Sequence, residues 1–134
     1  MNNQQIVEQF YAHLGRGEME AAFALLHPDF VLHQAPSLPY GGDFVGRTGI
    51  ERFFHLLGDT WSEFGSRDVV YVEVEDRVIA TSQMYGTIRG TTTRLEMPMV
   101  QVYRVQNGRL IETHPFYWDT AAITAAIAQR HTDT

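Results

Sequence analysis

Two histidines and one aspartate are the residues of this sequence whose types suit proton-transfer chemistry. His33 ends a short apolar stretch, while His114 and Asp119 flank the aromatic residues of the segment HPFYWDT near the C-terminal end. The ordinary pKa of histidine, about 6.5, lets its imidazole accept or donate a proton near neutral pH. We therefore treat His33, His114 and Asp119 as candidate catalytic residues.

Each of these residues also has a purely structural interpretation. Asp119 precedes the alanine-rich run AAITAAIAQR, so its carboxylate can cap a helix by accepting backbone N–H bonds, which is the simpler interpretation. A capping carboxylate is held at a low pKa and is a poorer base. His33 and His114 can be histidines with satisfied hydrogen bonds in the interior or at its rim. The sequence leaves both alternatives open for each residue.

Apolar periodicity predicts the elements that must position these residues. Helical spacing predicts helices near residues 2–14, 18–26 and 48–61, and a fourth, short helix after Asp119. Alternation predicts strands near 30–34, 70–74, 78–88, 94–105 and 110–118, and Asn107-Gly108 indicates a hairpin between the last two. Because the helices mostly precede the strands, we expect an α+β fold in which a highly curved antiparallel sheet wraps on three helices. A funnel between sheet and helices suits a small molecule.

Composition narrows the classes of function. The 134 residues suit one domain, 1–134, without an internal repeat or linker. A net charge of −6 argues against a nucleic-acid partner. No apolar run reaches the ~18 residues of a membrane span and the N-terminal residues lack a secretory pattern, so we expect a cytoplasmic protein without a membrane partner. Cysteine, HExxH and His-x-His are absent, so we expect no metal site.

Three long segments carry a resemblance to a known family: FYAHLGRGEMEAAFALLHPDFVLH, PYGGDFVGRTGIERFF and VYRVQNGRLIETHPFYWDTAAI. Together they resemble the nuclear transport factor two-like superfamily, and within it the SnoaL-like and ketosteroid isomerase-related proteins. The resemblance implies a cone-shaped α+β barrel, a homodimer formed through the outer face of the sheet, and no metal or organic cofactor. Its enzymes perform proton transfer inside an apolar cone, but the same fold also serves binding-only proteins.

Ketosteroid isomerase chemistry is not expected, because the positions that correspond to its catalytic residues hold residues of other types in this sequence. By motif, the base position corresponds to His33, the tyrosine position to Phe10 or its neighbour Tyr11, and the acid position to Pro98. Neither proline nor phenylalanine can donate a hydrogen bond to a dienolate. Similarity to the SnoaL-like cyclases instead implies an acid/base carboxylate at Asp119, with His33 and His114 assisting.

Strand alternation supplies a predicted cavity wall. His114, Phe116 and Trp118 share one face of the last strand, and by resemblance we place them toward the cone. The resemblance also places one face of the preceding strand inward and makes the opposite face, with Met97, Met99, Gln101 and Tyr103, a dimer surface. The predicted lining residues are Phe10, Tyr40, Phe54, Trp61, Pro98, Val100, Val102, Phe116 and Trp118.

The segment APSLPYGGDFVGRTG is predicted to be a glycine-containing loop that leads into the third helix. An alternative is that Tyr40 and Asp43 form a lid over the mouth of the cone. Two functions remain open. One is a cofactor-free acid/base enzyme of the isomerase, cyclase or hydrolase type, acting on a small apolar or polycyclic molecule. The other is a non-catalytic ligand-binding or dimeric interaction domain.

Overall fold

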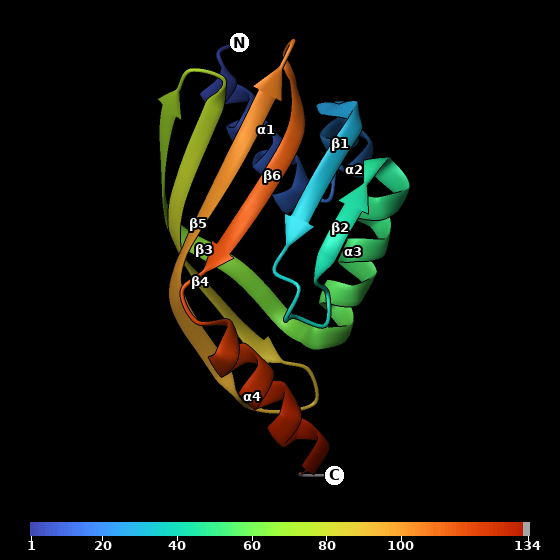
Figure 1. Cartoon of the computed structure of the whole chain (residues 1–134), viewed down its shortest axis with the longest axis vertical. Helices are drawn as coiled ribbons and strands as arrows, with labels where there is room; N and C mark the ends of the chain where they lie inside the picture. Colours follow the sequence, from blue (N-terminus) through green and yellow to red (C-terminus); the bar gives the residue numbers. More distant parts are fainter. Residues whose placement is uncertain (133–134) are drawn as a thin grey trace.

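The computed structural model describes residues 1–132 as four helices and one six-stranded sheet (Figure 1). The elements in chain order are α1 (Asn3–Gly15), α2 (Met19–Phe23), β1 (Leu26–Gln34), β2 (Gly42–Val45), α3 (Gly46–Thr60), β3 (Trp61–Val74), β4 (Arg77–Ile88), β5 (Arg94–Gln106), β6 (Arg109–Tyr117) and α4 (Thr120–Thr132). This confirms the predicted α+β fold, with a curved sheet, three N-terminal helices and a short C-terminal helix. Among the described residues, no helix is long and apolar enough to cross a membrane.

The strand order is β2-β1-β6-β5-β4-β3, and all neighbours are antiparallel except β1 and β6. The parallel pair joins segments far apart in the sequence, with Leu32 opposite Thr113. Next to that pair, His33 and His114 lie on the same face of the sheet, because side chains alternate along a strand. This parallel pairing was not part of the predicted antiparallel sheet.

Several local features follow directly from residue type. Asn2 caps α1 through a capping box with Gln5, in which each side chain accepts from the other residue's backbone N–H. Asn107 and Gly108 both have positive φ, 52° and 76°, which is the backbone geometry of a tight hairpin turn between β5 and β6. The predicted Asn-Gly hairpin is therefore confirmed.

Three boundaries differ from the sequence-based expectation. β1 begins at Leu26 instead of residue 30, and Pro28 is accommodated because the pairing with β6 shifts between Leu26 and Val31. The predicted loop contains the short strand β2, which pairs with the end of β1. β3 begins at Trp61, directly after α3, rather than near residue 70.

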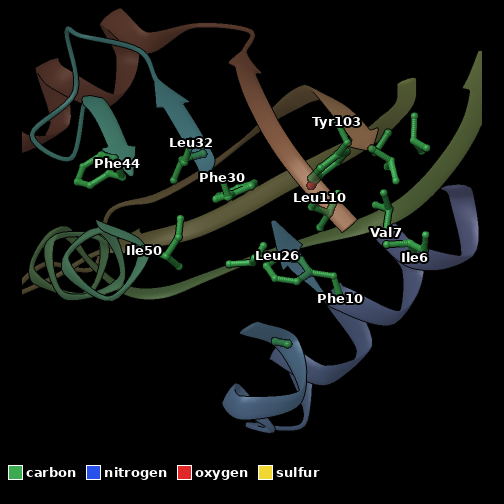
Figure 2. Close-up of a cluster of buried hydrophobic side chains, with 14 residues drawn as sticks. Ile6, Val7, Phe10, Leu26, Phe30, Leu32, Phe44, Ile50, Tyr103 and Leu110 are labelled. Atoms are coloured by element: carbon green, nitrogen blue, oxygen red, sulfur yellow. The ribbon is translucent and has the colours of Figure 1, made fainter. Parts of the chain in front are cut away.

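The concave side of the sheet is covered by α1 and α3, and α4 lies at the end of the molecule opposite the N-terminus (Figure 1). Two clusters of buried side chains fill the interior. In the first, residues of α1, β1, α3 and β6 converge, among them Phe10, Leu32, Ile50 and Leu110 (Figure 2). The second cluster, around Tyr40, Trp61 and Met84, also takes up Ile123 of α4 and so holds that helix to the sheet.

Candidate ligand-binding cavity

A cavity of about 540 Å³ lies between the concave face of the sheet and helices α1 and α3. Its wall is mostly aromatic and aliphatic, and its lining includes Phe10, Leu14, Phe30, Leu32, Ile50, Phe53, Phe54, Leu57, Phe64, Met99 and Leu110. The volume falls within the range of about 300–1,000 Å³ that is usual for small-molecule sites. The cavity can therefore take up a molecule with several rings.

Two buried polar atoms of the wall have no hydrogen-bond partner within the described chain: Oε1 of Gln34 and Oγ1 of Thr113. Both side chains line the cavity, and both residues are almost fully buried. A buried polar atom without a partner costs about 1–3 kcal/mol. A ligand that donates to Gln34 and exchanges a hydrogen bond with Thr113 would remove that cost.

A directed chain of hydrogen bonds ends at a third polar group of the wall, the hydroxyl of Tyr117. The indole N–H of Trp61 donates to the hydroxyl of Tyr40 at 3.2 Å, and Tyr40 in turn donates to Tyr117 at 3.1 Å. Since an indole can only donate, the direction of its bond to Tyr40 is fixed. The proton of Tyr117 is therefore not used in its bond with Tyr40, and the side chain of Gln34 is its hydrogen-bonding neighbour on the cavity wall. Burial raises the pKa of Tyr117 well above its ordinary value of 10.0, so it stays a donor at neutral pH.

Two further tyrosines meet a glutamine on the same wall. The hydroxyl of Tyr11 on α1 donates to Oε1 of Gln101 on β5 at 2.6 Å, and Tyr103 donates to the same oxygen. Burial is the main cause that raises the pKa of Tyr11, so this phenol also stays protonated. The shared acceptor ties α1 to the sheet and fixes the polar strip of the cavity wall.

No cavity-lining residue within the described part of the chain is an aspartate, glutamate, histidine, lysine, arginine or cysteine. General acid–base catalysis near neutral pH relies on groups of this kind. Tyrosine hydroxyls are the acidic groups that the wall offers, and their pKa values are raised further by burial. The cavity can donate hydrogen bonds but contains no strong proton acceptor.

The predicted orientation of β5 and β6 is wrong. Gln101 and Tyr103 of β5, with Thr113, Pro115 and Tyr117 of β6, line the cavity. The other parity, Pro98, Val100, Val102, His114 and Phe116, lies on the outer face, and Phe116 is 57% exposed. The bulky, polar-tipped side chains occupy the interior because Tyr117, Tyr103 and Gln101 find hydrogen-bond partners there.

Of the other residues predicted to line the cavity, some do so and others lie elsewhere. Phe10 and Phe54 line the cavity as predicted. Tyr40 and Trp61 are instead buried in the second core cluster, where they support Tyr117 from behind. Trp118 follows β6 and is 78% exposed, so it lies outside the wall. Tyr40 is also too deeply buried to act as the lid that was the alternative for its segment.

Asp119 lies at the start of α4, on the surface and outside the cavity. Its Oδ1 accepts the backbone N–H of Ala122 at 3.1 Å. This is the geometry of an N-cap, in which a side-chain oxygen satisfies one of the free N–H groups in the first turn of a helix. The structure therefore agrees with the capping interpretation and places the carboxylate away from the cavity wall.

His33 and His114 come together, but on the outer face of the sheet. Their rings stack with centroids 4.3 Å apart and an angle of 17° between the planes. His33 also contacts Asp43 of β2, so Asp43 belongs to this outer cluster and not to a lid. The sequence identified both histidines, but not Glu112, which shares their face of the sheet and contacts His33. The spacing Glu-x-His in residues 112–114 was the available signal, because residues two apart share a strand face.

Comparison with known proteins supports this fold and defines a family. A family model described as a SnoaL-like domain matches residues 7–113, and the chain therefore belongs to the SnoaL-like domain family. A comparison with curated proteins finds no match.

Solved structures resemble the chain along most of its length. An NTF2-like protein from Burkholderia thailandensis E264 has a TM-score of 0.85 and 26% identity, covering 95% of this chain and 98% of its own. TerC, co-crystallised with polyporic acid, has a TM-score of 0.83 and 19% identity, covering 94% and 98%. A candidate polyketide cyclase from Pseudomonas putida KT2440 has a TM-score of 0.75 and 17% identity, covering 92% and 97%. At these identities the last two show a shared fold alone.

Proposed function

We propose that this protein binds a small polycyclic or otherwise largely apolar molecule, bearing carbonyl and hydroxyl groups, in the cavity between the sheet and α1. The observation that carries the proposal is the pair of buried, unpartnered oxygens of Gln34 and Thr113 in an otherwise apolar wall. Buried polar groups normally have partners. A ligand hydroxyl can donate to Gln34, and a ligand carbonyl can accept from Thr113 or Tyr117.

The structural neighbours are consistent with this proposal, because they include TerC, co-crystallised with polyporic acid, and a candidate polyketide cyclase. Aromatic side chains on both sides of the cavity, such as Phe10 and Phe64, favour flat rings over flexible chains. The negative net charge of −6 and the absence of a cationic side chain from the described cavity wall disfavour phosphorylated or carboxylated ligands.

Non-catalytic binding is the first form of the proposal, since the wall lacks a proton acceptor of suitable pKa. Cyclase or isomerase chemistry is the second candidate, and the directed chain from Trp61 through Tyr40 to Tyr117 favours it. A hydrogen bond from Tyr117 to a ligand carbonyl would stabilise an enolate, but the base would have to belong to the substrate itself. Neither form uses Asp119, His33 or His114, because they lie outside the cavity.

We also propose that the protein forms a homodimer through the outer face of the sheet. Cross-strand pairing makes a mostly apolar surface there, the outer apolar patch, which consists of Val70, Val72, Ile79, Val100, Val102 and Phe116, with Thr81 and His114 in the same two rows. Val70 and Val72 are at least half exposed. Contiguous exposed apolar surface on a folded domain is typical of an interface.

Charged side chains border this patch and suit a second copy of the same chain. The next row across β4, β5 and β6 consists of Arg77, Arg104 and Glu112. Because the row carries both signs of charge, a two-fold arrangement can bring an arginine of one copy to the carboxylate of the other. The face of β5 expected at the interface is therefore the one with Val100 and Val102, and not the face with Gln101 and Tyr103 that the sequence predicted.

Calorimetric titration with a panel of hydroxylated naphthoquinones and anthraquinones, matched with the parent hydrocarbons, tests the binding proposal. We expect saturable binding of one molecule per chain and weaker binding of each hydrocarbon, since it cannot satisfy Gln34 or Thr113. Thr113→Val should weaken binding of the hydroxylated compounds about 5–10-fold, the loss of one hydrogen bond. Thr92→Val, in the exposed turn between β4 and β5, is the matched control. Equal binding of hydroxylated compounds and hydrocarbons would contradict the assignment.

Catalysis is tested on the compounds that bind. Each is incubated with the wild-type protein in deuterium oxide, and proton exchange next to its carbonyl groups is followed by NMR. Acceleration that disappears in Tyr117→Phe would favour the enzymatic candidate. Exchange at the rate of the protein-free control would leave binding as the function.

A further inference from the structure

Three side chains with metal-binding atoms converge on the outer face of the sheet, which is opposite the face that lines the cavity. His33 comes from β1, and Glu112 and His114 come from β6. One nitrogen of each histidine and one oxygen of the glutamate all lie within 4.8 Å of one another. The parallel register that sets Leu32 opposite Thr113 is what brings them together, across 79 positions of sequence between His33 and Glu112.

The histidine of β1 is held from behind by a carboxylate. Nδ1 of His33 lies 2.7 Å from Oδ1 of Asp43, and Nε2 lies 2.9 Å from Oε2 of Glu112. When His33 is neutral, a hydrogen bond from Nδ1–H to Asp43 leaves the lone pair of Nε2 directed toward Glu112 and away from β2. A carboxylate that accepts from the far nitrogen is the usual companion of a metal-ligating histidine.

The second oxygen of Glu112 is also positioned. Nη1 of Arg104 lies 3.4 Å from Oε1 of Glu112, which leaves Oε2 as the oxygen that faces His33. The ring of His114 is stacked between those of His33 and Phe116, so its orientation is restricted from both sides. His33 and Glu112 are thus held by polar neighbours, whereas His114 is held by ring stacking alone.

We propose that His33, Glu112 and His114 bind a divalent transition-metal ion of the zinc type, with Asp43 as the positioning residue of His33. Two imidazoles and one carboxylate form a ligand set that zinc uses, with a fourth position open to water. Tetrahedral ligands around zinc are about 3.3 Å apart. The separations of up to 4.8 Å must therefore shorten, and His114 must rotate out of its stack with His33, because parallel rings do not direct their nitrogen lone pairs at one point.

The same contacts have one explanation without a metal. A neutral imidazole carries a single N–H and carboxylates only accept, so two short contacts to Asp43 and Glu112 require an imidazolium at His33. A metal ion on Nε2 would replace the second proton and keep the hydrogen bond to Asp43. The two explanations differ in what added metal does, and this makes the proposal testable.

The experiment uses the full chain after removal of metal with a chelator. Zinc chloride is titrated into it at pH 7.5 by calorimetry, and cobalt chloride is followed by visible absorption, which reports four-coordinate nitrogen and oxygen ligation. We expect one ion per chain with a Kd of about 10 µM or tighter. Far-UV circular dichroism before and after titration checks that every variant is folded.

Four variants distinguish the proposed site from incidental binding. His114→Ala and Glu112→Gln should each weaken zinc binding about 100-fold, and Asp43→Asn about 10-fold or more, the loss typical of removing an outer hydrogen bond. His55→Ala, which removes an exposed histidine on α3, is the matched control and should bind as the wild type does.

Two results would overturn the proposal. One is the absence of saturable zinc binding tighter than about 100 µM, which would leave the imidazolium between two carboxylates as the explanation. The other is binding that His114→Ala leaves unchanged. Val72→Glu, designed to disrupt the outer apolar patch, should retain the affinity, and its loss there would show that the ligands come from two chains.

Discussion

The hydroxyl of Tyr117 lies 3.1 Å from that of Tyr40, and Tyr40 is the donor of the pair. Because Tyr40 donates in this pair, the proton of Tyr117 is not used in it, and Tyr117 lines the cavity beside Gln34. A donor that is already oriented at a cavity wall can bind a ligand acceptor without a rearrangement of the protein side chains. The buried aromatic residues of the second core cluster thereby determine the polarity of the binding site.

Tyr117→Phe tests this relationship. The substitution keeps the ring but removes the donor, so we expect the affinity for a carbonyl-bearing ligand to fall about 5–10-fold, with little change for the parent hydrocarbon. Calorimetry on the compounds that bind the wild type measures both affinities. Tyr85→Phe on the outer face of β4 is the matched control and should change neither. An equal loss for carbonyl compound and hydrocarbon would indicate damage to the cavity shape rather than loss of a donor.

The buried tyrosines predict loss of stability at alkaline pH. Burial is the leading cause that raises the pKa values of Tyr11, Tyr40 and Tyr117 above the ordinary value of 10.0. In the unfolded chain these phenols ionise near pH 10, whereas in the folded chain they stay protonated. The unfolded state therefore binds fewer protons above pH 10, and the free energy of unfolding falls as pH rises.

Absorbance of tyrosinate and far-UV circular dichroism, recorded together between pH 9 and 12, measure this effect. We expect the ionisation of these phenols to coincide with loss of the circular dichroism signal. Tyr11→Phe and Tyr117→Phe should each shift the midpoint to higher pH. Full ionisation of all tyrosines in a protein that stays folded would contradict the raised pKa values.

The substitution Val72→Glu tests the proposed homodimer. Val72 lies on the edge strand β3 of the outer apolar patch, opposite Ile79, and is half exposed. A carboxylate there would be buried without a partner in the proposed dimer but solvated in the monomer, so we expect the variant to be monomeric and folded. Light scattering coupled to gel filtration measures the mass. Val45→Glu introduces the same charge at an exposed valine on β2 and should leave the dimer intact. A monomeric wild-type protein would refute the homodimer.

The succession of elements was predictable because it depends on local signals such as the apolar spacing of α1 and the turn at Asn107-Gly108. Which face of β5 points inward was not, because alternation groups Gln101 with Tyr103 but does not say which side of the sheet they occupy. The decisive interactions, such as the bond from Tyr11 to Gln101, join residues 90 positions apart. The interior thus contains the phenols, and the valines lie outside.

The candidate site was predictable only in part for the same reason. His33 and His114 were identified by type, but their common neighbour Glu112 depends on the parallel pairing of β1 with β6, for which the sequence has no local signal. Gln34 and Thr113 were missed as well, since a polar residue at a strand position indicates a binding site only when its partners are known to be absent.

Substitutions of Asp119 separate a helix cap from an acid/base group. Asp119→Ala removes the oxygen that accepts the N–H of Ala122, so we expect the free energy of unfolding to fall by about 1 kcal/mol. Asp119→Asn keeps an accepting oxygen and should be nearly as stable as the wild type, because asparagine is as good an N-cap as aspartate. Urea denaturation measures both. Because the carboxylate lies outside the cavity, the affinity for hydroxylated quinones should change less than twofold in either variant. A large loss of binding or of proton exchange in Asp119→Asn, with stability unchanged, would instead identify Asp119 as a functional carboxylate that reaches the ligand.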